Sequence, residues 1–370
     1  MRLGIDATPL LNNRTGIGTY VEHLLAGLLV VPNEERPRVT ATTFSRTGGA
    51  GLHGHLPEGV AVRARRVPAR ALQASWRTLR IPGVEWLCGR QDVFHATNFV
   101  LPPLGTARGV LTVHDLSFLR YPETVTADTL RYRWLVPDGI RRAEVITTLT
   151  QSVADEIATE YRTEPEKIIV ASPGVDEHWF DVAPLTELDR QRLGVSGRYL
   201  LAVGTLEPRK NLRTLVAGYR CLLDEQPDAP PLVLVGGSGW GADLDLTAFP
   251  AGAVITPGYL PAALLRRVVA AAVCLAFPSV YEGFGLPPVE ALACATPVLA
   301  SDLPVTREVL GGAADLIEPR DVDAWTAGLR RALDETPDPA RREARIAQAR
   351  RWTWANCLRA NLRAYRAALR

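Results

Sequence analysis

Short apolar segments that alternate with amphipathic helices constrain the fold of this chain more than any other feature. Such alternation predicts a mostly parallel sheet that is covered by helices on both faces. The pattern occurs once in the first half of the chain and starts again after residues 172–180. We therefore expect an α/β fold with two doubly wound units. The strand candidates are residues 2–5, 39–44, 60–65, 93–95, 110–113 and 145–148 in the first half, and residues 199–203, 232–235, 274–277 and 298–300 in the second.

The length of 370 residues suits two domains of this kind. The break in the pattern predicts one domain over residues 1–175 and a second over residues 176–353. The arginine-rich tail, residues 340–370, is predicted to be helical throughout, with a kink near Trp352 and Thr353. The other helix candidates are residues 19–30, 129–142, 152–161, 212–223, 264–272 and 289–295.

The composition excludes several classes of protein. A formal net charge of +2 argues against a dedicated nucleic-acid binder, which would carry a concentrated basic excess. The five cysteines are scattered, so we expect reduced thiols and neither a disulfide framework nor a metal site. The first residues lack a signal-peptide core, and the longest apolar run, residues 268–277, has about half the length of a membrane span. We expect a soluble, cytoplasmic protein that could still touch a membrane surface, and the sequence does not predict its oligomeric state.

The segment EGFGLPPVE, from Glu282 to Glu290, follows a predicted strand and opens a predicted helix. Its glycines let the backbone approach a ligand closely, and its prolines suit a first helical turn. A helix N-terminus favours a phosphate, and carboxylates accept hydrogen bonds from sugar hydroxyls. A capped helix start is the alternative, but it does not account for two carboxylates, two glycines and two prolines together. The expected donor-binding residues here are Glu282, Gly283, Phe284, Gly285, Leu286 and Glu290.

A second segment, GTLEPRKN at residues 204–211, follows the first strand candidate of the second half. Arg209 and Lys210 are adjacent cations in this strand-to-helix loop, and Lys210 is one of only two lysines in the chain. Two such cations neutralise a diphosphate leaving group without a metal ion. An exposed basic loop is the alternative.

Weaker signals lie at the ends of strand candidates in the first half. The segment TGIGT, residues 15–19, resembles an anion site lined by backbone around Gly16, although a plain tight turn has the same pattern. His114 ends a strand and is a candidate for contact with a sugar hydroxyl or for stabilising charge at the anomeric carbon. His95 ends another strand and is a candidate for the same cleft. A histidine at a strand end is often structural, so both alternatives stay open.

Two further patterns have a simple structural interpretation. The triplets Asp243-Leu-Asp245 and Asp321-Val-Asp323 resemble metal-binding D-x-D motifs, but both are expected at helix starts, where aspartate acts as a cap. Seven arginines lie between Arg63 and Arg90, interleaved with tryptophans. This segment suits an anionic acceptor or a membrane surface, and a solvated face is the simpler interpretation.

With these motifs in place, the sequence resembles family 4 of the glycosyltransferases, and in particular its bacterial mannosyltransferase-B-like members. The resemblance covers nearly the whole chain, and the combination of EPRKN with EGFGLPxxE is its most specific part. It implies a GT-B fold, with two Rossmann-like domains that face each other across a cleft. It also implies retaining sugar transfer without a bound metal or other cofactor.

The resemblance also implies roles for individual residues. Glu282 would contact the donor sugar, Glu290 the ribose, and Arg209 and Lys210 the diphosphate. In the acceptor-side domain, Gly16 would lie near the phosphate or the acceptor, and His114 at the sugar. The C-terminal helix, residues 354–370, would cross back onto that domain. One departure is Ala295, where family members often have glycine.

We thus expect a retaining hexosyltransferase that uses a nucleoside-diphosphate sugar, with GDP-mannose as the donor that the resemblance favours. The acceptor would carry a hydroxyl on a glycan, a lipid-linked sugar or a secondary metabolite. A sugar-nucleotide epimerase of GT-B architecture and a non-catalytic sugar-nucleotide-binding protein remain alternatives. A retaining glycosidase is disfavoured. Its two catalytic carboxyls lie about 5 Å apart, whereas Glu282 and Glu290 are eight residues apart, which is roughly 12 Å along a helix.

Overall fold

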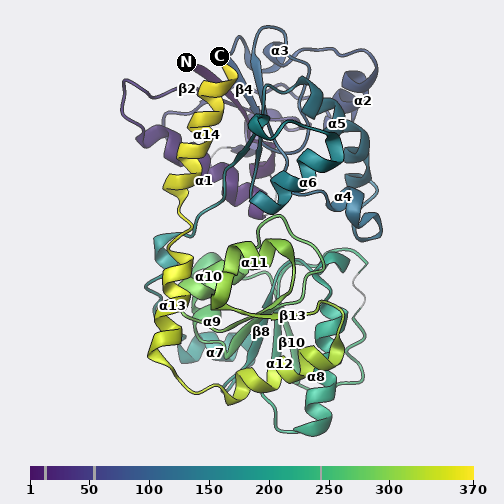
Figure 1. The fold of residues 1–370 in the computed structure, drawn as a ribbon, viewed down its shortest axis with the longest axis vertical. Coiled ribbons are helices and arrows are strands. Elements are labelled where there is room, and N and C mark those ends of the chain that lie inside the picture. Colours follow the sequence, from purple (N-terminus) through teal and green to yellow (C-terminus); the bar gives the residue numbers. More distant parts are fainter. Residues whose placement is uncertain (12–14, 53–55, 242–243) are drawn as a thin grey trace. The chain divides into compact units, whose positions relative to one another are not determined.

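The computed structural model describes residues 1–11, 15–52, 56–241 and 244–370, which form two compact units (Figure 1). The chain enters each unit more than once. The first unit comprises Met1–Leu119, Ala127–Gly174 and Thr353–Arg370, and the second comprises Arg120–Thr126 and Val175–Trp352. The short excursion of residues 120–126 into the second unit has no signal in the sequence pattern.

A parallel sheet of seven strands forms the centre of the first unit, in the order β3-β2-β1-β4-β5-β6-β7. The order reverses direction between β1 and β4, which is the arrangement of a doubly wound fold. Its strands are β1 (Arg2–Asp6), β2 (Arg38–Thr42), β3 (Ala61–Val62), β4 (Val93–Ala96), β5 (Arg108–Thr112), β6 (Val145–Thr148) and β7 (Ile168–Val170). Its helices are α1 (Gly16–Val30), α2 (Ala69–Thr78), α3 (Val84–Cys88), α4 (Ser117–Arg120), α5 (Tyr132–Arg142), α6 (Gln151–Tyr161) and α14 (Trp354–Ala368).

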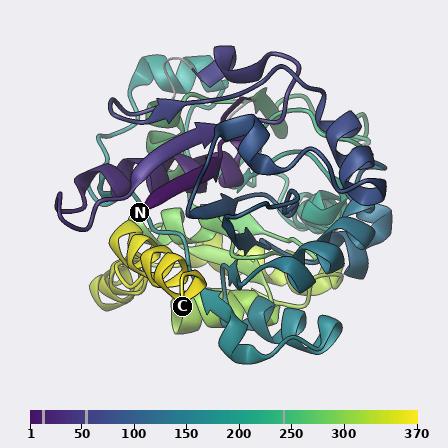
Figure 2. The same cartoon turned by 90° about the horizontal axis from the view of Figure 1, so that it is seen from above.

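The C-terminal helix α14 is part of the core of the first unit. It lies beside α1, and both chain termini lie in this unit (Figures 1 and 2). Its buried residues Cys357, Ala364 and Tyr365 pack in one cluster with apolar residues of α1 and of the sheet. Asn361 exchanges hydrogen bonds with the buried hydroxyl of Tyr20, at 2.9 and 3.1 Å.

The second unit has a parallel sheet of six strands in the order β10-β9-β8-β11-β12-β13, which reverses direction between β8 and β11. The predicted α/β fold with two doubly wound parallel sheets is thus confirmed. The strands are β8 (Leu200–Val203), β9 (Leu232–Val235), β10 (Val254–Gly258), β11 (Cys274–Phe277), β12 (Val298–Ser301) and β13 (Asp315–Ile317). The helices are α7 (Glu187–Leu193), α8 (Leu212–Glu225), α9 (Ala262–Ala270), α10 (Leu286–Ala293), α11 (Pro304–Leu310), α12 (Val322–Asp334) and α13 (Pro339–Ala349).

The C-terminal tail is interrupted where the sequence predicts a kink, near Trp352 and Thr353. The interruption is larger than a kink, because α13 ends at Ala349 and α14 begins only at Trp354. Thr353 caps α14 by accepting a hydrogen bond from the backbone N–H of Asn356. The interruption coincides with the passage of the chain from the second unit to the first.

None of the helices in the described ranges combines the length and the apolar character that a membrane-spanning segment needs.

Candidate functional site

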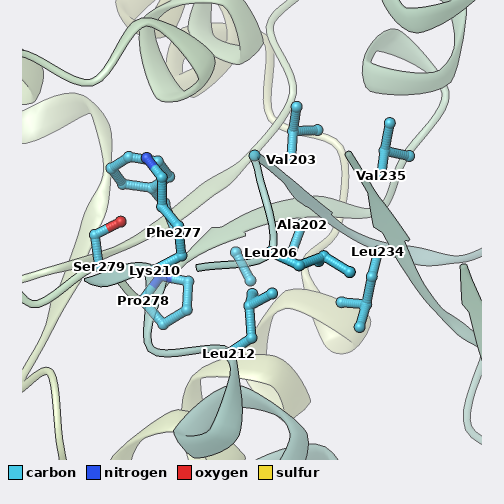
Figure 3. A pocket seen from close by; sticks show the side chains of 12 residues that line it. Ala202, Val203, Leu206, Lys210, Leu212, Leu234, Val235, Phe277, Pro278 and Ser279 are labelled. Atoms are coloured by element: carbon cyan, nitrogen blue, oxygen red, sulfur yellow. The ribbon is translucent and has the colours of Figure 1, made fainter. Parts of the chain in front are cut away.

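A small pocket lies at the point where the strand order of the second sheet reverses (Figure 3). Ligands of open α/β sheets bind at such a point, beyond the carboxyl ends of the strands. The pocket has apolar walls, and Lys210 and Ser279 are its polar side chains in Figure 3. The other lining residues are Ala202, Val203, Gly204, Leu206, Leu212, Leu234, Val235, Ala276, Phe277 and Pro278.

The neighbouring residues Arg209 and Lys210 meet Glu282, which is more distant in sequence, beside this pocket. The Nζ atom of Lys210 lies 2.6 Å from one carboxylate oxygen of Glu282, and a guanidinium nitrogen of Arg209 lies 3.0 Å from the other. A second guanidinium nitrogen of Arg209 lies 2.8 Å from Glu207. The side chains of Arg209 and Lys210 are only 17% and 15% exposed, so their charges are poorly screened by water.

The two cations also control the ionisation of Glu282. Burial alone would raise the pKa of this carboxyl, but Arg209 and Lys210 lower it to about 2. Glu282 is therefore ionised at neutral pH, and its charge holds both cations in place. A carboxylate oxygen has more than one lone pair, so it can accept a further hydrogen bond from a hydroxyl.

Asn211 fixes the shape of the loop that carries the two cations. Its backbone has a φ of 50°, in the left-handed region where asparagine is tolerated. Its side-chain amide donates to the carbonyls of Pro278 and Pro319, at 3.1 and 2.6 Å. The N–H of Val280 donates to the carbonyl of Arg209. These bonds tie the loop after β8 to the loops after β11 and β13.

The start of α10 borders the same site. Gly285 has a φ of 88°, which favours glycine, and it immediately precedes the helix. Pro287 and Pro288 have no N–H, so the first turn offers an anion fewer backbone donors than an ordinary helix start. Phe284 is buried against Trp352, with ring centroids 5.2 Å apart, so its side chain is part of the core. Gly283 lies in the loop before Phe284, and Leu286 is the first residue of α10.

Glu290 has different neighbours from the other predicted donor-binding residues. Among the described residues, its side chain has no hydrogen bond or ion pair with Arg209, Lys210 or Glu282. Its pKa is raised to about 7, mainly by burial, with Arg266 lowering it and Asp176 raising it. Glu290 is thus partly protonated near neutral pH.

In the first unit, His114 lies just after the carboxyl end of β5, and Gly16 begins α1. His114 is buried, and its Nε2 atom lies 2.7 Å from the carbonyl oxygen of Thr97. A carbonyl only accepts, so Nε2 carries the proton and Nδ1 is left as an acceptor. Burial lowers the pKa of His114, so the imidazole is neutral. Gly16 is the exposed first residue of α1, which Thr15 caps through the N–H of Gly18.

Two sequence hypotheses are wrong. His95 does not face a ligand, because it is fully buried between the hydroxyls of Tyr365 and Thr112, at 2.8 and 2.7 Å. Asp245 is not at a helix start, because it binds the N–H and hydroxyl of Thr247 in a turn. Its partner Asp243 lies outside the described residues.

Asp321 is the N-cap of α12, as predicted, and accepts from the N–H of Ala324 at 2.9 Å. Within the described ranges, no group of three or more histidine, cysteine or acidic side chains could hold a metal ion.

Sequence reasoning missed several residues around the site. Glu207 and Asn211 stand inside the segment that was singled out, but nothing in their spacing indicates an ion pair or a loop tie. Tyr121 belongs to the excursion from the first half of the chain, and its ring lies 5.4 Å from that of Tyr281, the residue before Glu282. Only the folded chain brings these two tyrosines together.

Two family models together match most of the chain. Residues 14–179 match glycosyltransferase family 4, and residues 186–352 match glycosyl transferases group 1. The O-antigen chain mannosyltransferase B of Escherichia coli is 30% identical, over 99% of this chain and 100% of the relative. The D-inositol 3-phosphate glycosyltransferase of Kineococcus radiotolerans is 34% identical, over 62% of this chain and 58% of its own length.

Solved structures share the fold at low sequence identity. HepE of Anabaena, in complex with UDP-glucose, has a TM-score of 0.70 at 17% identity and covers 97% of both chains. WaaG, a glycosyltransferase of lipopolysaccharide biosynthesis, has a TM-score of 0.65 at 18% identity, over 97% of this chain and 94% of its own. The matches over the whole chain, together with the two doubly wound units, show that this chain belongs to glycosyltransferase family 4 and is a glycosyltransferase of the GT-B fold.

Proposed function

We propose that this glycosyltransferase moves a hexose from a nucleoside-diphosphate sugar to a hydroxyl group of its acceptor, with retention at the anomeric carbon and without a metal ion. The observation that carries the proposal is the pair of poorly exposed cations, Arg209 and Lys210, beside the pocket at the reversal point of the second sheet. Retention is proposed from the family resemblance alone.

The chemistry explains why these cations suit the reaction. When the bond between the anomeric carbon and the diphosphate oxygen breaks, the electron pair stays on the diphosphate and its negative charge grows. Arg209 and Lys210 are already oriented by Glu282 and Glu207, so they can stabilise that charge with little reorganisation. The acceptor hydroxyl forms the new bond to the anomeric carbon and passes its proton to the departing diphosphate oxygen.

We propose different roles for Glu282 and Glu290, as the family resemblance implies. Glu282 holds both cations and keeps the capacity to accept a hydrogen bond from a sugar hydroxyl. Glu290, in the adjoining helix α10, is proposed to accept from the ribose. The backbone of Gly283, Gly285 and Leu286 would border the diphosphate. In the first unit, His114 and Gly16 are proposed to act at the transferred sugar and at the phosphate or acceptor.

We propose GDP-mannose as the donor and a glycan, lipid-linked sugar or secondary metabolite as the acceptor. The full-length relative named as a mannosyltransferase favours mannose. The complex of HepE with UDP-glucose supports a nucleotide sugar in general and makes UDP-glucose the first competitor to test.

A donor panel with product analysis tests the proposal. Purified protein is incubated with GDP-mannose, UDP-glucose and other nucleotide sugars, and release of nucleoside diphosphate is followed with and without candidate acceptors. We expect GDP-mannose to support transfer, undiminished in EDTA, and NMR of the product to show the anomeric configuration of the donor. Complete loss in EDTA with recovery on adding manganese, or an inverted product, would contradict it. An epimerase would instead change the sugar nucleotide without an acceptor.

A further inference from the structure

One surface of the first unit combines exposed arginines with exposed large apolar side chains. We call it the arginine–tryptophan surface. Its apolar members are exposed to unusual extents for their size: Leu79 67%, Ile81 59%, Trp134 56% and Trp86 47%. Its basic members are Arg63, Arg65, Arg66, Arg70, Arg77, Arg80 and Arg90, all of which are exposed.

Two contacts between an arginine and a tryptophan ring occur among these side chains. The guanidinium of Arg77, in the last turn of α2, lies 5.3 Å from the ring centroid of Trp134 in α5. The turn after α2 is held against the helix, because the hydroxyl of Ser75 donates to the carbonyl of Ile81 at 2.5 Å. Arg65 lies over the ring of Trp86 in α3, 4.2 Å from its centroid. Figure 1 shows α2 and α5 side by side in the first unit.

The surface carries a large uncompensated positive charge. Between residues 63 and 90 there are seven arginines and a single acidic residue, Glu85. The Glu85 carboxylate accepts hydrogen bonds from three successive backbone N–H groups, those of residues 105–107, so it is turned to the main chain. Arg70 and Arg80 have carboxylate partners, Asp128 and Asp138. The other five arginines have no ion-pair partner among the described residues.

The apolar side chains decide what kind of anion this surface suits. A soluble polyanion is held by arginines and by stacking aromatics, and it gains nothing from exposed leucine and isoleucine. The boundary of an anionic bilayer suits all three kinds of side chain. Leucine and isoleucine enter the acyl region, tryptophan lies at the level of the headgroups, and arginine pairs with lipid phosphates.

We propose that the arginine–tryptophan surface docks this enzyme peripherally on anionic lipid bilayers. Leu79, Ile81 and Trp134 would form its apolar contact, surrounded by the arginines between residues 63 and 90. The proposal is independent of the donor chemistry, because each of its residues belongs to the first unit and none has a role in the proposed transfer.

Vesicle co-sedimentation of the full chain tests this proposal. We expect binding to vesicles of phosphatidylglycerol and phosphatidylcholine, none to phosphatidylcholine alone, and release at high salt, which shortens the screening length from about 10 Å to about 3 Å. Combined Arg66→Ser, Arg77→Ser and Arg90→Ser changes should lower partitioning roughly a hundredfold. Combined Leu79→Ser and Ile81→Ser changes should lower it about tenfold or more at constant charge.

Matched control variants separate this surface from general effects of charge and hydrophobicity. Leu188→Ser with Leu369→Ser removes two other exposed leucines, and Arg192→Ser with Arg363→Ser removes two other exposed arginines. Both should bind vesicles as the unmodified chain does. All variants should keep their melting temperature and their affinity for the nucleoside diphosphate, so a failure here is distinct from a failure of the proposed transfer.

Three results would overturn the proposal. The first is absence of vesicle binding by the unmodified chain. The second is equal binding to anionic and neutral vesicles, or unchanged binding by both surface variants. The third is binding to heparin or RNA that is lost in the arginine variant but unaffected by Leu79→Ser and Ile81→Ser, with no vesicle binding, which would identify a soluble polyanion as the partner.

Discussion

Arg209 and Lys210 are neighbours in sequence but differ in what they hold in place. Arg209 contacts two buried carboxylates, Glu207 and Glu282, and the carbonyl of Tyr281, whereas Lys210 has an ion pair with Glu282 alone among the residues that the structure describes. Breaking a buried ion pair costs about 3–5 kcal/mol. We therefore expect Arg209→Met to lower both the melting temperature and turnover. Lys210→Met should lower turnover by about 10²–10³-fold with a smaller loss of stability.

Thermal unfolding and steady-state kinetics on the two variants measure these effects separately. Arg213→Met, in the first turn of α8, is a control for loss of a nearby exposed charge and should keep both properties. If Lys210→Met raised only the Michaelis constant and left kcat intact, Lys210 would bind the donor without stabilising the leaving group.

Glu290 predicts a pH dependence of nucleotide binding. Its pKa of about 7 means that the free protein carries a proton there below neutral pH. Ribose hydroxyls donate best to the ionised carboxylate, so binding must displace this proton. Calorimetry should therefore show affinity for the nucleoside diphosphate rising as pH increases through about 7. Glu290→Gln should remove that part of the dependence and leave only the titration of the phosphate itself.

The Glu290 carboxyl also makes the stability of the folded protein depend on pH. Its pKa in the folded state lies above the ordinary value of 4.5, so the folded protein binds the extra proton between about pH 4.5 and 7. Stability should fall as pH rises through that window, and this fall should be smaller in Glu290→Gln. Identical pH profiles of melting temperature for the two proteins would mean that the carboxyl has an ordinary pKa.

At the level of residues, the sequence predicted what is charged but not how the charges are paired. EPRKN and EGFGLPPVE stand after strands, so their positions at the sheet edge follow from the chain pattern alone. The ion pairs of Glu282 and Glu207 depend on side-chain directions that no spacing rule contains. His95 was misjudged because a strand-end position does not reveal that Thr112 and Tyr365 enclose the ring.

Helix α10 is followed at its C-terminal end by a non-glycine residue, Ala295, in the left-handed conformation. The N–H of Ala295 donates to Leu292 and that of Thr296 to Ala291, which is the hydrogen-bond pattern of a Schellman motif. Ala295 has a φ of 61°, in the left-handed region that costs a non-glycine residue roughly 1–2 kcal/mol. We expect Ala295→Gly to stabilise the protein by about 1 kcal/mol and raise the melting temperature by about 2–4 °C.

The control for this substitution lies in the same helix. Ala293 is buried within α10, so Ala293→Gly should destabilise the protein by about 1 kcal/mol or more. Nucleotide affinity should be unchanged in Ala295→Gly, because the change is at the far end of α10 from Gly285. A lower melting temperature for Ala295→Gly would show that the Cβ of Ala295 contributes more through packing than its backbone strain costs.

At the level of elements, the buried strands were the easiest to predict. β6, β9 and β11 coincide with their predicted ranges, because each is a short apolar or β-branched run between polar loops. β7, β10 and β13 were missed; they are less completely buried and carry weaker periodicity. β13 pairs with β12, and β10 with β9, at the two edges of the second sheet, so their positions are set by neighbours rather than by local pattern.

At the level of the whole molecule, the chain passes between the two units more than once. Residues 120–126 leave the first half to join the second unit, where Trp240 donates to the carbonyl of Thr124 at 3.1 Å. Residues 353–370 return from the second unit to the first. Each unit is therefore completed by a segment that the other half of the sequence supplies.

This path predicts the effect of removing α14. Ending the chain at Trp352 takes Tyr365 and Asn361 away from His95 and Tyr20, and each of these buried polar groups would lose a hydrogen bond at about 1–3 kcal/mol. It also uncovers the apolar cluster of α1 and the sheet. We expect the first unit to lose its cooperative unfolding transition in calorimetry, while the second unit still melts cooperatively and binds the nucleoside diphosphate. A control chain ending at Ala368, which loses only exposed residues, should melt like the full chain. Full retention of the first unit's transition in the shorter chain would show that α14 is dispensable for its core.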